Sequence, residues 1–144
     1  MKGKIISINI SKEKGTSKKP VEKDKLVKLK ENFGIVDDAH SGTEKEVSFL
    51  GWETVVEWLR DKSEKLKTKI NPGDFAENIT TEGINWQKAK IGSIIEIANS
   101  EVILKVSHIG KSCHSYCNIK KLVGDCIMPK NGVFAKVIKG GNIK

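Results

Sequence analysis

The chain has 144 residues, of which 38% are apolar, so it can bury the core of one domain. No apolar stretch approaches the length of a membrane span, which argues against a membrane protein. The formal net charge is +8, but every basic residue except Arg60 is lysine. Because base and phosphate recognition relies on the bidentate arginine fork, this composition argues against a nucleic-acid partner.

The three cysteines indicate the compartment in which the protein works. An odd number of cysteines, with no recognisable secretory signal, favours reduced thiols over a disulfide framework. We therefore expect a cytoplasmic protein, organised as a single domain over residues 1–144.

The first third of the chain predicts short strands separated by polar turns. A β-branched run at 5–10 predicts a buried first strand, and the polar segment that ends at Pro20 predicts a surface loop. Alternating charged and apolar residues at 21–29 favour a second strand. A short strand that enters a polar turn is expected at 34–42, and another strand at 47–50.

One helix is predicted around residues 52–62. Trp52, Val55, Val56 and Leu59 recur at helical spacing, which places them on one face of a helix of about three turns. The lysine-rich stretch that follows predicts a solvated exit, and the glycine-bounded polar segment 73–83 predicts a loop.

The remainder of the chain predicts further strands. Residues 91–98 and 102–106 flank an Asn-Ser-Glu turn and predict a hairpin, and 132–138 predicts a final strand closed by two glycines. Many short strands and few helices indicate a mainly β fold, either a β-barrel or a sandwich.

The strongest candidate for covalent chemistry lies between His108 and Cys117. Two of the three cysteines and two of the three histidines fall in this stretch. A thiol is nucleophilic as its thiolate, and nearby cations favour that form. Cys113 is therefore the predicted nucleophile, with Lys111 and His114 as the neighbours that activate it.

Several motifs resemble the MOSC domain, named for the C-terminal domain of molybdenum cofactor sulfurase. They are Gly-Asp-Phe-x-Glu-Asn-Ile at 73–79, a following Thr-x-Gly, Ile-Gly at 91–92 and a lone cysteine after the next strand. The segment 36–42 is similar to the family's early Gly-Asp-x-His-x-Gly turn, and 132–137 to its closing strand. The resemblance extends from about Ile5 to the C-terminus.

This resemblance implies a β-barrel with a few peripheral helices. It also implies that Cys113 carries sulfane sulfur as a persulfide, or coordinates molybdenum as in relatives that keep the cofactor bound. In such relatives the asparagine matched by Asn78 borders the cofactor pocket. Glu77 beside it, Asp38 in the early turn and Lys111 are expected to bind the cofactor as well.

Other residues have more than one interpretation. His40, beside Asp38, is either an acid/base or orienting group in a cofactor site, or a turn histidine that is hydrogen-bonded for structure. Cys117 could resolve a persulfide on Cys113 as a disulfide, and Cys126 is expected to be structural. A zinc site is a further alternative. Its ligands would come from His108, Cys113, His114, Cys117 and Cys126.

The leading hypothesis is a sulfur carrier and not a complete enzyme. Cys113 would accept sulfur from a cysteine desulfurase and pass it to molybdenum cofactor or another metal–sulfur assembly, with no intrinsic cofactor. The main alternative is a module that binds molybdate or molybdopterin, with Cys113 as the molybdenum ligand. The third hypothesis is a zinc-stabilised structural domain.

Overall fold

The computed structural model describes residues 2–13, 16–110 and 132–144, and this part of the chain is mainly β. The strands are β1 Lys4–Ile10, β2 Lys19–Pro20, β3 Val27–Lys30, β4 Gly34–Ile35, β5 Val47–Gly51, β6 Ile79–Glu82, β7 Ile94–Glu96, β8 Ile103–Ile109, β9 Val133–Lys139 and β10 Gly141–Ile143. The helices are α1 Trp52–Leu59 and α2 Glu64–Lys67, with one 3₁₀ turn, η1, at Trp86–Lys88.

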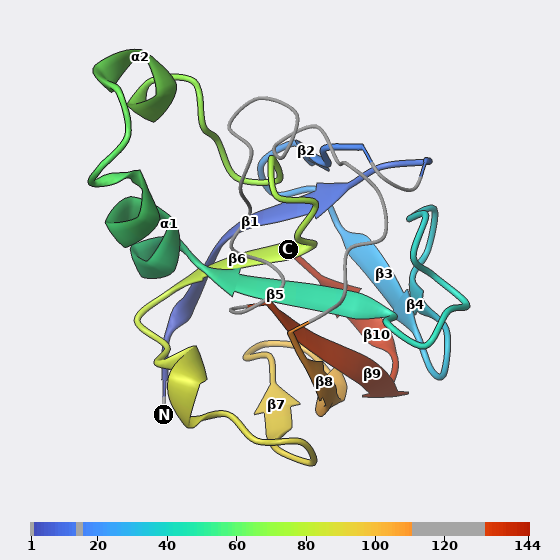
Figure 1. Ribbon diagram of the computed structural model, residues 1–144. Coiled ribbons are helices and arrows are strands. Elements are labelled where there is room, and N and C mark those ends of the chain that lie inside the picture. The colour runs from blue at the N-terminus through green and yellow to red at the C-terminus, as the bar shows by residue number, and fades with distance from the viewer. Residues whose placement is uncertain (1, 14–15, 111–131) are drawn as a thin grey trace.

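Seven strands form one sheet in the order β2-β1-β6-β5-β9-β8-β7, and β10, β3 and β4 form a second sheet (Figure 1). β6 pairs parallel with β5 and antiparallel with β1. The predicted mainly β fold is therefore confirmed. The predicted barrel closure is not, because in the described ranges β2 and β7 remain the outer strands of the large sheet. Closure would require the two outer strands to pair.

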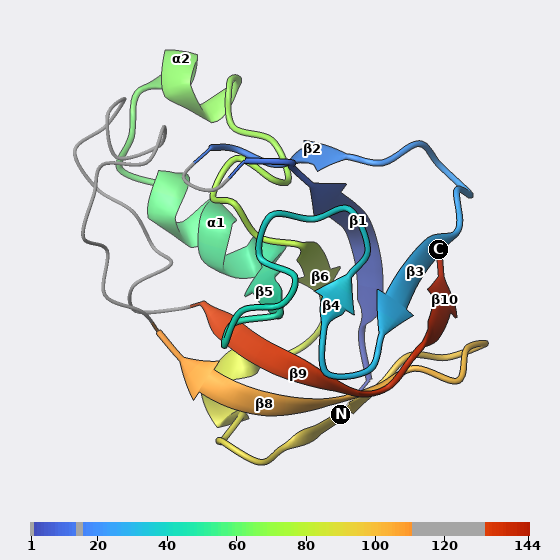
Figure 2. The same cartoon turned by 90° about the vertical axis from the view of Figure 1, so that its right-hand side faces the viewer.

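The large sheet is covered on both faces, which explains why β5 at its centre is buried along its whole length. On one face the small sheet supplies Val27, Leu29, Ile35 and Ile143 to the main core. On the other face α1 packs over a second apolar cluster. Figure 2 shows α1 and the small sheet on opposite sides of β5.

The predicted helix is confirmed, but it ends at Leu59, before the expected end near residue 62. Val55 and Leu59 are buried against Leu50 and Phe134, as the helical spacing of apolar residues predicts, but Val56, which is predicted on the same face, is exposed. The lysine-rich segment after α1 contains the short helix α2, which the sequence analysis did not predict. Ser63 caps it by accepting a hydrogen bond from Leu66 N at 3.2 Å.

The strand predictions differ from the structure mainly at segment ends and at one loop. β7 and β8 form the expected antiparallel hairpin. In 21–29, strand structure starts only at Val27. The predicted loop 73–83 contains β6, an interior strand whose first three residues are buried. Polar composition misled that prediction, because β6 buries two threonines and satisfies them by hydrogen bonding.

Candidate functional site

Lys18 is the centre of a buried polar cluster formed by loops near the end of β1. Its side chain is fully buried, and Nζ donates a hydrogen bond to Asp38 Oδ1 at 2.7 Å. The same Nζ lies 3.0 Å from His40 Nδ1. The structure thus brings Asp38 and His40 together, as the sequence predicted, but it organises them around a lysine that the sequence analysis had assigned to a solvated surface.

Asp38 is held as an anion by its surroundings. Burial by itself raises the pKa of this carboxyl, but the hydrogen bond and charge of Lys18, with hydrogen bonds from two backbone N–H groups, hold the pKa below its ordinary value of 3.8. Those backbone donors are Ser11 N, 3.1 Å from Oδ1, and His40 N, 3.1 Å from Oδ2. The Asp38 carboxylate therefore links the loop at Ser11 and the turn at His40 to the buried ammonium of Lys18.

His40 is the most exposed side chain of this cluster, with 25% of its side chain accessible. An ammonium has hydrogen to donate and no lone pair to accept with, so at 3.0 Å Lys18 Nζ acts as donor to His40 Nδ1. This contact assigns the remaining ring proton to Nε2. The structure is compatible with both interpretations of His40. Its backbone N–H supports the turn by bonding to Asp38, and its ring is accessible enough to act as an acid/base or orienting group.

The main chain of Lys18 connects the cluster to the Gly-Asp-Phe segment. Lys18 N donates to Gly73 O at 2.8 Å. Gly73 has a φ of +94°, and a Cβ there would lie 2.3 Å from Lys18 O. Only glycine permits both the left-handed conformation and this close approach. Gly73, the first residue of the Gly-Asp-Phe-x-Glu-Asn-Ile motif, is therefore required for the motif to pack against the Lys18 backbone.

Asn78 is buried and fixes the start of β6 between its neighbours. Oδ1 accepts hydrogen bonds from Ser48 N at 3.0 Å and from Ser48 Oγ at 3.1 Å. Nδ2 donates to Asn9 O at 3.2 Å. The amide thus joins β1 and β5 across β6. The polar sequence around Asn78 predicts a surface loop, but the residue lies in the interior.

Replacing Asn78 with alanine is expected to destabilise the fold by about 2 to 4 kcal/mol. The change leaves Ser48 N–H and Asn9 C=O buried without these partners, and each such group costs about 1–3 kcal/mol. Chemical denaturation measures the effect, with the exposed Asn142→Ala on β10 as the control. Equal stability of the two variants would show that the Asn78 hydrogen bonds contribute nothing.

Glu77 is fully buried one residue earlier, and its carboxylate closes the turn that precedes β6. Oε1 accepts from Phe75 N at 3.2 Å, and Oε2 accepts from Thr80 Oγ1 at 3.0 Å. Asn9 Nδ2 donates to both Glu77 O and Thr80 Oγ1. Burial raises the pKa of Glu77 to about 7, although hydrogen bonds from backbone N–H groups and Thr80 oppose the rise.

This burial predicts a stability that falls as the pH rises. The folded-state pKa of about 7 lies above the ordinary 4.5, so the folded protein binds the Glu77 proton more tightly than the unfolded chain does. The contribution of Glu77 is complete below pH 4.5 and is lost as the pH approaches 7. The difference between these two pKa values corresponds to about 3 kcal/mol of unfolding free energy.

Glu77→Gln is expected to remove this dependence, since the amide has the shape of the protonated acid. At pH 8 the variant should be more stable than the wild type, and at pH 4.5 the two should be similar. Denaturation curves between pH 4.5 and pH 8 measure the unfolding free energy of both proteins, with the exposed Glu82→Gln as control. A Glu77→Gln curve parallel to the wild-type curve would contradict the assignment.

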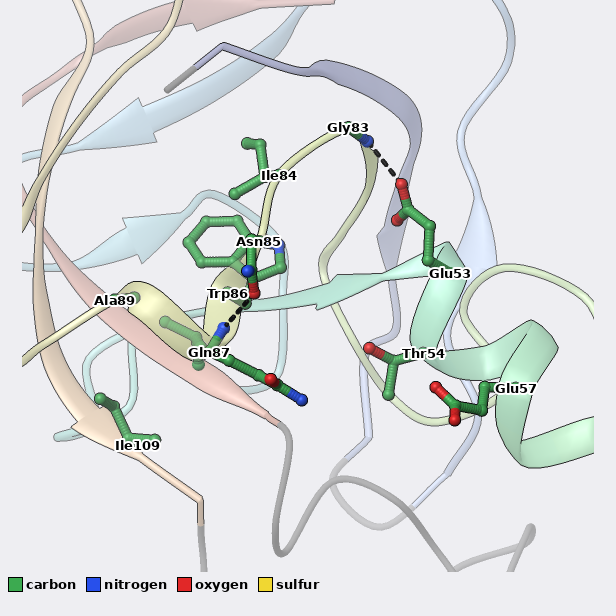
Figure 3. Close-up of a pocket in the computed structure, with 11 residues that line it drawn as sticks. Glu53, Thr54, Glu57, Gly83, Ile84, Asn85, Trp86, Gln87, Ala89 and Ile109 are labelled. Atoms are coloured by element: carbon green, nitrogen blue, oxygen red, sulfur yellow. Dashed lines mark hydrogen bonds between the residues drawn. The ribbon is translucent and has the colours of Figure 1, made fainter.

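A separate open cavity of about 440 Å³ lies beyond the ends of β5 and β6 (Figure 3). Its walls come from α1, from the segment after β6 that includes η1, and from the adjacent ends of β8 and β9. The lining residues are Glu53, Thr54, Glu57, Gly83, Ile84, Asn85, Trp86, Gln87, Ala89, Ile109 and Val133. None of these residues is predicted as a site residue from the sequence.

The predicted nucleophile and its activating neighbours, Cys113, Lys111 and His114, lie outside the described residues, as do Cys117 and Cys126. His108, the remaining predicted zinc ligand, lies on β8 with Nδ1 3.0 Å from Ser107 Oγ. Within 2–13, 16–110 and 132–144, no group of three or more His, Cys, Asp or Glu side chains is arranged to hold a metal ion. None of the helices in these ranges is long and apolar enough to cross a membrane.

The described residues do not form a cradle for an anionic cofactor. Asp38, Glu77 and Asn78 direct their side-chain oxygens and amide to partners within the protein. The buried ammonium of Lys18 is paired with Asp38. The cavity presents two carboxylates, and no cation is among the described residues that line it. Among the described residues, a cofactor phosphate therefore finds no unpaired complementary charge at the Asp38 cluster and no cation in the cavity lining.

Solved structures share this arrangement of sheets. The chain is similar to YuaD from Bacillus subtilis, with a TM-score of 0.75, 18% identity, and coverage of 99% of this chain and 91% of that one. YiiM from Geobacillus stearothermophilus gives a TM-score of 0.71 at 23% identity, with coverage of 99% and 71%. YiiM from Escherichia coli gives 0.71 at 17% identity, with coverage of 100% and 66%. The mainly β fold is thus the fold of these proteins.

The family model of the MOSC domain matches residues 36–144, and the chain belongs to this family. The match contains both the early turn with Asp38 and His40 and the Gly73 segment, and the family is associated with molybdenum-cofactor-related sulfur chemistry. Curated protein sequences give no match. The chain spans 65% of the length of a hypothetical protein of known structure and 66% of E. coli YiiM.

Proposed function

We propose that the protein is a sulfur carrier in which Cys113 holds sulfane sulfur as a persulfide. Family membership supports sulfur chemistry connected with molybdenum cofactor. Cys113 lies in a sequence that supplies Lys111 and His114 as cationic or titratable neighbours, which favour the thiolate. Molybdenum cofactor, or another metal–sulfur assembly, is the proposed acceptor.

The proposed loading step is a thiol–persulfide exchange. The Cys113 thiolate attacks the terminal sulfur of a persulfide on a cysteine desulfurase. The sulfur–sulfur bond of the donor breaks, and a new one forms on Cys113. The donor cysteine leaves as a thiolate, so the step needs no external oxidant or reductant. The desulfurase must be a partner protein under this proposal.

One observation favours carrying over permanent cofactor binding. The residues expected to contact an anionic cofactor, Asp38, Glu77 and Asn78, are already bonded within the protein interior. A carrier does not need them as ligands, because it requires a reactive thiol and access for two partners. In this proposal these residues support the fold around the site and do not bind the cofactor.

Metal and sulfur analysis of the protein from a molybdate-fed host tests the proposal. A carrier should contain little metal and should gain one sulfur atom when it is incubated with a cysteine desulfurase and cysteine. Stoichiometric molybdenum together with no sulfur uptake would instead support the molybdopterin-binding module. Stoichiometric zinc would support the structural domain.

A further inference from the structure

The cavity beside α1 is lined by carboxylates and apolar side chains, and the proposed sulfur transfer uses none of them. Two glutamates on α1, Glu53 and Glu57, are one helical turn apart and line it together (Figure 3). The helix dipole favours Glu53, which lies in the first turn of α1, but Glu57 lies beyond that turn and repels Glu53. Together the two carboxylates give the cavity a negative potential.

The position of Glu53 is fixed by the backbone on the opposite wall. Its Oε2 accepts a hydrogen bond from Gly83 N at 2.6 Å, just after the end of β6. Glu57 is exposed, and its carboxylate projects from α1 toward Gln87 across the cavity (Figure 3). One carboxylate is therefore held in place, while the other can adjust to a bound group.

The wall opposite α1 combines an apolar surface with the polar side chains of Asn85 and Gln87. Trp86 packs against Phe49 with ring centroids 5.2 Å apart, and its Nε1 donates to Thr81 Oγ1 at 2.7 Å. Ile84, Ile109 and Val133 extend this surface. An aromatic ring already held by a ring contact and a hydrogen bond does not need to be ordered when a ligand binds, which lowers the entropic cost of binding.

We propose that this cavity binds an organic cation, namely a protonated amine on a compact apolar or aromatic body. The ammonium would lie between the two carboxylates, and the apolar body would contact Trp86 and the isoleucines. The volume of about 440 Å³ is within the range of small-molecule sites. Every residue of the proposed site lies in the described part of the chain, and none of them takes part in the proposed sulfur transfer.

Three probes of nearly equal size and different charge test the proposal: benzylammonium, benzyl alcohol and benzoate. Binding is followed by titration of the Trp86 indole N–H signal in ¹H–¹⁵N NMR spectra, assigned by its loss in Trp86→Phe. Fragments of this size bind weakly, so the titrations extend into the millimolar range. Benzylammonium should bind about tenfold more tightly than benzyl alcohol, given two carboxylates. Benzoate should bind most weakly.

Glu57→Gln should weaken benzylammonium binding about threefold and leave benzyl alcohol unchanged, since it removes one exposed charge and keeps the shape. Glu101→Gln, in the turn before β8, is the matched control and should change neither. The proposal is wrong if benzoate binds as tightly as benzylammonium or if no probe shifts the Trp86 signal. It is also wrong if Glu57→Gln and Glu101→Gln bind benzylammonium equally tightly.

Discussion

Cys113→Ser is expected to abolish sulfur uptake from a cysteine desulfurase while leaving the fold intact. The wild type should gain the mass of one sulfur atom, and a thiol reductant should remove it, because a persulfide is reducible. Serine has nearly the size of cysteine, but its hydroxyl cannot form a persulfide. Intact-mass spectrometry before and after reduction measures the gain, and peptide mapping assigns it.

Two variants control this result. Cys126→Ser should retain full uptake, since Cys126 is predicted to be structural. Lys111→Ala should slow loading by about tenfold if the thiol pKa rises by roughly one unit, without changing the final amount of sulfur. Uptake that persists in Cys113→Ser would assign the sulfur to another cysteine. No uptake by the wild type from any competent donor would exclude the carrier.

Lys18→Met should be the most destabilising substitution in the buried polar cluster, with an expected loss of about 3–5 kcal/mol. Methionine occupies a similar volume but leaves the Asp38 carboxylate buried without the cation that lies 2.7 Å from it. Removal of one partner from a buried ion pair leaves an uncompensated charge, which costs more than the net contribution of the intact pair. Denaturant titration near pH 7 measures the difference in unfolding free energy.

Lys19→Met is the matched control, because the neighbouring lysine is exposed and should be replaceable at little cost. The double variant Lys18→Met/Asp38→Asn should regain part of the loss, since the asparagine carries no charge that needs a partner. If Lys18→Met and Lys19→Met are equally stable, the buried pair does not support the fold.

The pH dependence of the wild type provides a second check on this pair. Because the folded-state pKa of Asp38 is below its ordinary 3.8, its contribution is present above that pH and is lost as the pH falls through the lower, folded value. Glu77 acts in the opposite direction, since its contribution is lost as the pH rises from 4.5 to about 7. Stability should therefore be greatest in mildly acidic solution.

The opposite signs come from the partners of the two carboxylates. Both are desolvated, which by itself raises a pKa. Asp38 meets an ammonium, whereas Glu77 meets neutral N–H and O–H donors. At Asp38 the hydrogen bond and charge of Lys18, with two backbone hydrogen bonds, together outweigh the desolvation, whereas the neutral donors at Glu77 do not. In this protein the Glu77 carboxyl is therefore predominantly neutral in the mildly acidic range below its pKa of about 7.

Local sequence pattern was sufficient for the elements whose burial follows a simple period. Apolar residues at helical spacing predicted α1, and alternation around an Asn-Ser-Glu turn predicted the hairpin of β7 and β8. In both cases neighbours along the chain decide the structure. The order of the short motifs likewise predicted the MOSC family, which the match over residues 36–144 confirms.

The tertiary structure alone decided which polar residues are internal. Lys18 resembles the surface lysines around it in sequence, and it is buried because Asp38, twenty residues away, meets it inside the protein. Asn78 and Glu77 lie in a segment that is polar enough to read as a loop. Hydrogen bonds from Ser48 and Thr80, and the pairing of β6 between β1 and β5, place both in the interior. Burial of a polar group depends on whether a partner reaches it, and the distant partners of Lys18 and Asn78 leave no local pattern. Glu77 has local partners but is buried because the strand that follows it lies inside the sheet.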